Sequence, residues 1–253
     1  MSLETVRVEE RGGALWLSLD RPPLNVLDLP TIRAIADVVM RLPARSDLKV
    51  LVLRSAVGGV FSAGVEVRDH ARERVGLMLS AFHALFRLLD GLPLATVAAV
   101  DGHCLGGGCE LAAFCDVVLA TPRSSFGQPE IDVGCFPPVA ASLLPRLVGR
   151  AAFEIVLSGA PIAAAEAVRI GLITRVVDDL DAETEVCVAR LTGKSRAVLA
   201  LARKALRHGR DESFREALAH NERLYREDLA ATEDIEEGVR AFLEKRTPRW
   251  RDA

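Results

Sequence analysis

The chain lacks the features that mark several classes of protein. Its 253 residues carry a net charge of only −3, include just four lysines and form no run of one charge sign. Nucleic-acid binding usually needs a concentrated basic surface, so we do not expect a nucleic acid as partner. The longest apolar run, Leu94–Val100, is too short to cross a bilayer. We therefore expect no membrane partner either.

Cysteine and histidine are also sparse, and their spacing is uninformative. The cysteines are odd in number and lie among apolar residues, without the paired short spacings of a zinc site or a disulfide framework. They are Cys104, Cys109, Cys115, Cys135 and Cys187. His70, His83 and His103 show no metal-ligand spacing. Because the first residues have no basic segment followed by an apolar one, we expect a cytoplasmic protein with reduced cysteines and no bound metal.

Apolar residues make up half of the chain, and their periodicity alternates between strand and helix. Strands are predicted at Ala14–Leu19, Lys49–Leu53, Ala95–Val100 and Val117–Ala120. Helices are predicted at Ile32–Met40, Arg74–Leu89 and Glu110–Cys115. This alternation indicates an α/β core in which helices cover at least one face of the sheet.

Beyond about Ser195 the strand pattern stops and a helical pattern takes over. Ser213 and Glu216 have the spacing of a capping box, and Ile235–Arg246 is amphipathic. We expect a core domain at residues 1–194 and a helical oligomerisation region at 195–253, because such helices cannot bury their apolar faces alone. The basic stretch Arg203–Arg210 is interpreted as a solvated helix face, with contact to a ligand phosphate as the alternative.

A glycine cluster precedes the predicted helix at Glu110–Cys115. Gly106, Gly107 and Gly108 leave backbone N–H groups uncovered where a strand passes into a helix, an arrangement that favours an anion or oxyanion. The glycines could equally serve close packing. No lysine follows them, so they form neither a phosphate loop nor a dinucleotide fingerprint.

Two glutamates stand next to apolar residues at predicted element junctions. Glu110 lies within Cys109–Phe114, and Glu130 follows the Gly127-Gln128-Pro129 break. A buried carboxylate is costly unless it is paired, hydrogen-bonded or functional. The two could form an acid/base pair, although spacing alone does not bring them together. Ser62 is no nucleophile elbow, because Val60 stands where that motif needs glycine.

Three segments together resemble the crotonase superfamily, the enoyl-CoA hydratase/isomerase family. They are Phe61–Glu66, Gly102–Leu111 and Phe126–Ile131, and the likeness extends from Leu19 to Trp250. The resemblance implies a crotonase-like spiral of β-β-α repeats and a C-terminal helical trimerisation region. It also implies a homotrimer or a dimer of trimers.

The resemblance further implies an acyl-CoA thioester as substrate, with no metal or redox cofactor. The backbone amides of Ala63 and Gly107 would hold the thioester oxygen. Glu110 would activate a water molecule and Glu130 would protonate the α-carbon, which favours hydration of an α,β-unsaturated thioester. Residues expected to contact substrate are Ser62, Ala63, Gly64, Val65, Glu66, Gly106, Gly107, Pro129, Phe136 and Pro137.

Two segments depart from the family pattern. The usual Ala-Gly-Ala-Asp reads Ala63–Glu66 here, and a glycine-rich stretch is replaced by Phe136–Ser142, which predicts a reshaped acyl pocket. Both segments are similar to cyclohexa-1,5-diene-1-carbonyl-CoA hydratases, so a cyclic dienoyl thioester is a candidate substrate. Double-bond isomerisation, thioester hydrolysis and a non-catalytic acyl-CoA- or RNA-binding scaffold are the alternatives.

Overall fold

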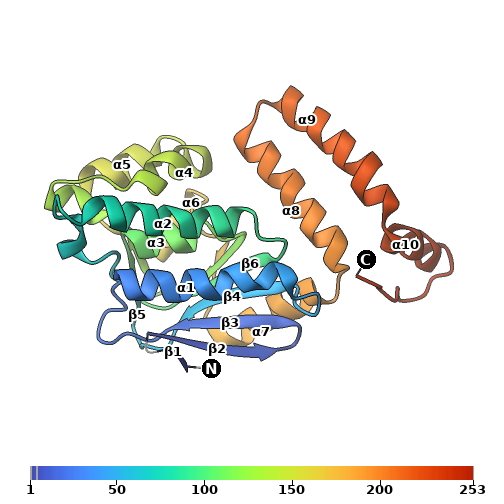
Figure 1. The fold of residues 1–253 in the computed structure, drawn as a ribbon, viewed down its shortest axis with the longest axis horizontal. Helices are drawn as coiled ribbons and strands as arrows, with labels where there is room; N and C mark the ends of the chain where they lie inside the picture. The colour runs from blue at the N-terminus through green and yellow to red at the C-terminus, as the bar shows by residue number, and fades with distance from the viewer. Residues whose placement is uncertain (1, 4, 253) are drawn as a thin grey trace.

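Two β-sheets organise the fold in the computed structural model, which describes residues 2–3 and 5–252. The larger sheet has seven strands (Figure 1). In spatial order they are β1 (Ser2–Leu3), β2 (Val6–Arg11), β3 (Ala14–Leu19), β4 (Val50–Ser55), β6 (Ala95–Val100), β8 (Val117–Ala120) and β11 (Arg175–Val176). From β3 to β11 the strands are parallel, whereas β1 and β2 pair antiparallel at the edge.

The second sheet has four short strands. In sequence, these strands fall between the strands of the larger sheet. The strands of the second sheet, in spatial order, are β10 (Ile162–Ala163), β9 (Ser125–Gly127), β7 (His103–Leu105) and β5 (Val60–Ser62). Each of the pairs β4–β5, β6–β7 and β8–β9 therefore gives one strand to each sheet before the chain enters a helix. This repeat is the β-β-α spiral that the resemblance implied.

Helices surround the sheets. The α-helices are α1 (Leu29–Arg41), α2 (Val75–Asp90), α3 (Gly107–Ala113), α4 (Pro138–Val148), α5 (Ala151–Ser158), α6 (Ala164–Arg169), α7 (Leu180–Thr192), α8 (Arg196–Asp211), α9 (Phe214–Arg223) and α10 (Glu233–Leu243). Short 3₁₀ turns lie at η1 (Leu42–Ala44), η2 (Val67–His70), η3 (Pro129–Val133) and η5 (Leu229–Ala231), and a π-helical turn at η4 (Leu224–Asp228). No helix of the described residues is long and apolar enough to cross a membrane.

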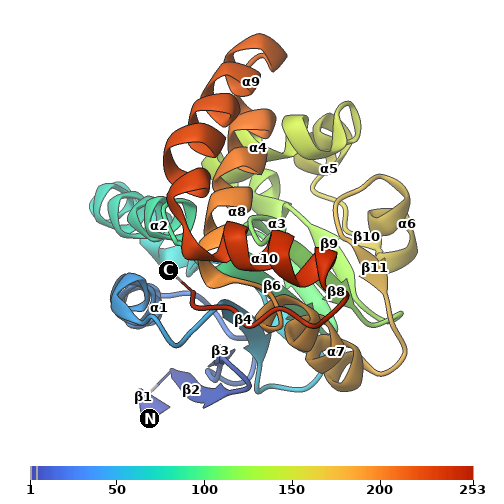
Figure 2. The same ribbon diagram turned by 90° about the vertical axis from the view of Figure 1, so that its right-hand side faces the viewer.

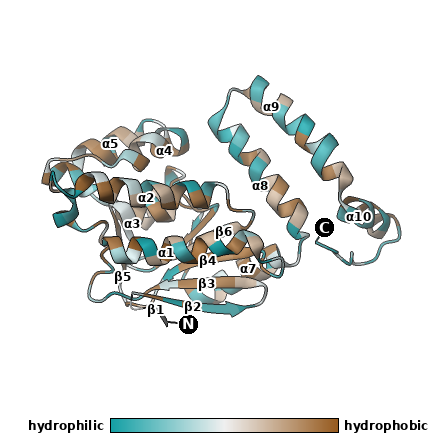
Figure 3. Cartoon of the chain, viewed as in Figure 1, coloured by the Kyte–Doolittle hydropathy of each residue, from teal (hydrophilic) through white to brown (hydrophobic). Residues whose placement is uncertain are grey.

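The large sheet is buried on both faces. A main core packs α1, α2 and α3 against one face, and a smaller cluster around Trp16, Val52 and Val97 packs against Val188 of α7 on the other. The central strands are correspondingly brown in the hydropathy colouring (Figure 3). Burial of both faces explains why β3 and β4 are continuous apolar runs rather than alternating ones.

Helices α8, α9 and α10 form an arm beside the spiral core (Figures 1 and 2). Arg203 of α8 is only 7% exposed and ties the arm to the core. Its guanidinium donates to the carbonyl oxygens of Leu89 (2.8 Å) and Leu92 (2.6 Å) and to the carboxylate of Asp116 (2.7 Å). The prediction that Arg203–Arg210 is a solvated face is thus wrong at Arg203, because the core supplies its partners.

Candidate active site

The loop after β5 is fixed by buried side chains. The Ser62 hydroxyl donates to the Asn25 carbonyl oxygen (2.7 Å) and accepts from the Gly64 amide (3.1 Å). The side-chain Nδ2 of Asn25 donates to the Phe61 carbonyl oxygen (3.1 Å). Ser62 is fully buried, and its hydroxyl is used within the protein. We therefore correct the prediction that it contacts substrate: it positions the loop.

The backbone amides of Ala63 and Val65 in this loop differ in whether they donate a hydrogen bond within the protein. The Ala63 amide donates to the Leu24 carbonyl oxygen at 2.9 Å, so it is not available to a ligand. For the Val65 amide, the described part of the chain offers no hydrogen-bond acceptor. The predicted donor Ala63 is therefore corrected to Val65, two residues further on. Sequence could not separate the two, because the loop's internal hydrogen bonds decide which amide is left over.

Gly107 places a second free amide beside Val65. It is the first residue of α3, so its N–H has no partner within the helix. A Cβ atom built on Gly107 would lie 3.4 Å from the Val65 nitrogen, and one built on Gly64 would lie 3.2 Å from the Gly107 nitrogen. The two amides thus lie at one spot, and side chains here would fill it. Two free amides this close to each other can donate to one oxygen atom, and their role as an oxyanion cradle stays a prediction.

Glu110 lies one turn into α3 and is only 2% exposed. Its Oε1 accepts a 2.7 Å hydrogen bond from the amide of Ala140, in the first turn of α4. Burial raises the pKa of Glu110 to about 8, and the nearby charge of Glu130 adds to that rise, while the α4 amides oppose it. Ala140 was missed by sequence reasoning, although Pro137-Pro138 before an apolar run is a helix-start signal.

Glu130 approaches the same spot from η3. Gly106, at φ +52°, leaves room for it: a Cβ atom there would lie 2.6 Å from Glu130 Oε1. Glu130 Oε2 is buried, and no partner for it is found among the described residues. Burial raises the pKa of Glu130 as well. The structure therefore brings the two predicted carboxyl groups together around Gly106 and Gly107.

A cavity of about 670 Å³ lies between α2, the end of α3, α4 and the end of α8. Phe86 and Phe114 form part of its wall and pack edge to face with ring centroids 5.1 Å apart. Val139, next to the residue that binds Glu110, lines it too. Arg87 and His83 of α2 supply polar groups. Its lining also includes the charged side chains of Asp90, Arg146, Arg210 and Asp211, so the cavity is of mixed polarity.

The other predicted contact residues lie on three different segments of the chain. Phe136 is 64% exposed, whereas Pro137 is buried as the N-cap of α4. Pro129 starts η3, which carries Glu130. The Glu66 carboxylate accepts from the Arg68 amide at 3.2 Å and caps η2. Whether these four contact a ligand stays a prediction.

Paired buried carboxyl groups beside two free amides define an acid–base enzyme that acts on a carbonyl compound. Comparison with known proteins gives the family: residues 9–253 match Enoyl-CoA hydratase/isomerase, and the chain belongs to that family. It is 38% identical over 250 residues to cyclohexa-1,5-dienecarbonyl-CoA hydratase of Thauera aromatica, covering 97% of this chain and 95% of that one.

Two further relatives agree. A probable enoyl-CoA hydratase of Mycobacterium bovis is 34% identical over 256 residues, covering 99% of both chains. The crystal structure of enoyl-CoA hydratase from Bacillus anthracis superposes with a TM-score of 0.93 at 27% identity, covering 99% of this chain and 100% of that one. The predicted crotonase fold is confirmed by these similarities.

Proposed function

We propose that the protein adds water across the double bond of an α,β-unsaturated acyl-CoA thioester. The observation that carries this proposal is the convergence of Glu110 and Glu130 beside the free amides of Val65 and Gly107. The hydratases named among the relatives support it. The chemistry needs no cofactor, because coenzyme A is part of the substrate.

In this mechanism the thioester oxygen accepts hydrogen bonds from the amides of Val65 and Gly107. Attack of water on the β-carbon moves the electron pair of the double bond through the α-carbon toward that oxygen. Fixed donors at the developing negative charge lower the barrier, each by about 3–4 kcal/mol. Gly107 also lies at the N-terminus of α3, where the helix dipole favours negative charge.

The carboxyl groups complete the proton balance. Glu110, as carboxylate, takes a proton from the attacking water, and Glu130, as acid, gives a proton to the α-carbon. One O–H bond and one C=C π bond break, while one C–O and one C–H bond form. Burial raises the pKa of both carboxyl groups, that of Glu110 to about 8, so Glu110 acts as the base in its ionised fraction, which grows as pH rises toward 8.

The acyl group that we propose is cyclic. The segments Ala63–Glu66 and Phe136–Ser142, which depart from the family pattern and are similar to those of cyclohexa-1,5-diene-1-carbonyl-CoA hydratases, favour such a group. The similarity to the Thauera aromatica enzyme supports the same choice. A cyclic dienoyl-CoA is therefore our first candidate, with straight-chain enoyl-CoA thioesters as the second.

We also propose a homo-oligomer, either a trimer or a dimer of trimers, located in the cytoplasm. The arm exposes apolar side chains that a second copy would cover, including Phe214 (82% exposed) and Phe242 (83% exposed). The five cysteines are all unpaired, which supports a reducing compartment. Light scattering of the purified chain tests the assembly: a monomer would contradict it.

A panel of thioesters tests the reaction. Purified protein is incubated separately with crotonyl-CoA, a branched enoyl-CoA and cyclohexa-1,5-diene-1-carbonyl-CoA. The masses of the products are then measured by mass spectrometry. We expect a gain of one water, fastest with the cyclic substrate. An unchanged mass would indicate isomerisation and free coenzyme A would indicate hydrolysis, and either would overturn the proposal. Tight binding without turnover across the panel would favour a non-catalytic scaffold.

A further inference from the structure

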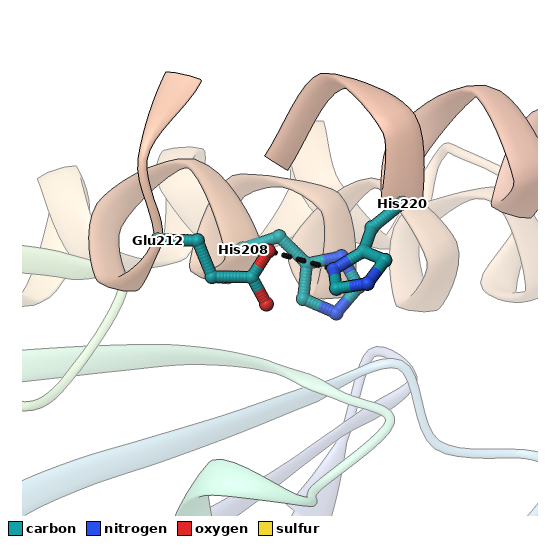
Figure 4. Close-up of side chains that lie close together, drawn as sticks. All are labelled: His208, Glu212 and His220. Atoms are coloured by element: carbon teal, nitrogen blue, oxygen red, sulfur yellow. Dashed lines mark hydrogen bonds and ion pairs between the residues drawn. The ribbon is translucent and has the colours of Figure 1, made fainter. Parts of the chain in front are cut away.

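A cluster of three potential metal ligands lies on the hairpin of α8 and α9. His208 lies in the last turn of α8 and Glu212 is the C-cap residue that follows it, while His220 projects from α9 toward them (Figure 4). All three are half-buried, and their ligand atoms lie within 4.8 Å of one another. The proposed hydration uses none of them.

Neighbouring hydrogen bonds orient the His208 ring. The Asn221 Nδ2 donates to the Ala205 carbonyl oxygen at 3.1 Å, so its Oδ1 is the atom that faces His208. This oxygen can only accept, and the His208 Nδ1 lies 3.2 Å from it. A neutral His208 therefore carries its proton on Nδ1 and leaves the Nε2 lone pair free. Such an outer hydrogen bond is the usual support of a histidine that binds a metal.

His220 is held in a similar way. Its Nδ1 lies 2.6 Å from Glu212 Oε2, and its ring lies beside that of His208 with centroids 5.2 Å apart. Both rings therefore offer a nitrogen atom within 4.8 Å of a ligand atom of Glu212.

The residues around the cluster leave a cavity beside it and carry a small net negative charge. A cavity of about 260 Å³ opens at the cluster. Glu227 and Asp228, from the π-helical turn η4, line it together with Glu212, and they are opposed by Lys204 and Arg223. Three carboxylates against two cations leave one net negative charge at the cavity. π-Helical turns are frequent at functional sites.

We propose that His208, Glu212 and His220 bind a divalent transition-metal ion such as zinc, which clamps α8 to α9. Two imidazoles and a carboxylate are a ligand set that zinc favours. Zn–N bonds of about 2.0–2.1 Å bring ligand atoms of one ion closer than they lie here, and side-chain rotation supplies the difference. The site would stabilise the arm and is independent of the proposed hydration.

Calorimetric titration of the metal-depleted full chain with Zn²⁺ tests this. We expect one ion per chain, and a loss of affinity of about tenfold or more in His208→Gln and in His220→Gln. Asn221→Leu removes only the orienting acceptor and should weaken binding by about 10- to 100-fold. His103→Gln, which removes an exposed histidine of β7, is the matched control and should bind as the parent does.

Cobalt(II) gives a second readout that does not depend on the variants folding. Bound to the parent at this site, Co²⁺ should show the intense visible absorption of a four-coordinate ion, and Zn²⁺ should displace it. Absence of that absorption in the parent would overturn the proposal. So would zinc affinity equal to the parent's in folded His208→Gln and His220→Gln.

Discussion

The backbone amide of Ala140 donates a 2.7 Å hydrogen bond to Oε1 of Glu110, joining the start of α4 to the middle of α3. This bond holds a carboxyl group that is almost completely buried and whose pKa is raised to about 8. The ordinary pKa of a solvent-exposed glutamate is near 4.5. The folded protein therefore favours the protonated form of Glu110 over its ionised form.

Replacing Glu110 by Gln should stabilise the protein at high pH. Between pH 4.5 and about 8 the native Glu110 keeps a proton that the unfolded chain has lost, so stability falls as pH rises through this window. Gln cannot ionise and still accepts from Ala140. We expect Glu110→Gln to match the parent near pH 4.5 and to exceed it by at most about 5 kcal/mol above pH 8.

Urea unfolding at pH 5, 7 and 9 measures this difference. The Glu→Gln change at Glu222, on the exposed surface of α9, is the control and should give a difference that varies little with pH. A parent-to-variant difference for Glu110→Gln that stays constant from pH 5 to pH 9 would contradict the raised pKa.

Gly106→Ala should abolish most activity, whereas Gly149→Ala should not. The two glycines have nearly the same backbone conformation, with φ +52° and ψ −130° against φ +57° and ψ −125°. Both substitutions therefore cost similar strain, about 1–3 kcal/mol. Only at Gly106 does the new Cβ meet Glu130, whereas nothing lies within 4 Å at Gly149.

We expect kcat of Gly106→Ala to fall by about 100-fold or more, as for loss of a general acid. Thermal melting of the two variants checks that strain is matched. Equal activity in both variants would show that the position of Glu130 does not limit turnover.

Proline substitutions separate the two loop amides. Val65→Pro deletes an amide with no acceptor among the described residues, so the protein should still fold while turnover falls by about 100- to 1,000-fold. Ala63→Pro deletes the donor to Leu24 and should lower the melting temperature instead. Circular dichroism melting and turnover of a thioester are measured on both. The reverse pattern would return the oxyanion role to Ala63.

Arg203→Ala should weaken the attachment of the arm, helices α8 to α10, to the core. It removes a buried guanidinium that donates to three carbonyl oxygens and to Asp116, and we expect a loss of about 3–5 kcal/mol in unfolding free energy. Arg226→Ala, at an exposed position of η4, should cost no more than about 0.5 kcal/mol. Equal losses in a denaturant titration would mean that Arg203 does not anchor α8.

The long helices and strands could be predicted from the sequence, because burial of one or both of their faces requires apolar residues at regular spacing. Strands β6 and β8 have the predicted bounds, and α2 is shifted by one residue at each end. Strand β5 is not among the predicted strands, since its three residues are too few to show a period and pair with β7, which lies far along the chain. Helix α3 begins at Gly107, three residues earlier than predicted, because a free helix start tolerates glycines.

The candidate site was predictable in its side chains and less so in its backbone. Glu110 and Glu130 are conspicuous as acidic residues among apolar ones, whereas the choice of Val65 over Ala63 depends on loop hydrogen bonds that no motif encodes. The cluster of His208, Glu212 and His220 was missed because His220 reaches it only through the pairing of two helices.

Turnover of cyclohexa-1,5-diene-1-carbonyl-CoA in ¹⁸O-labelled water, compared among the parent, Glu110→Gln and Glu130→Gln, tests the central claim most directly. We predict one labelled oxygen in the parent product and rates lower by about 100- to 10,000-fold in each variant, which loses one proton-transfer group. Unlabelled product, or either variant reacting as fast as the parent, would contradict the claim that these two carboxyl groups add water to the thioester.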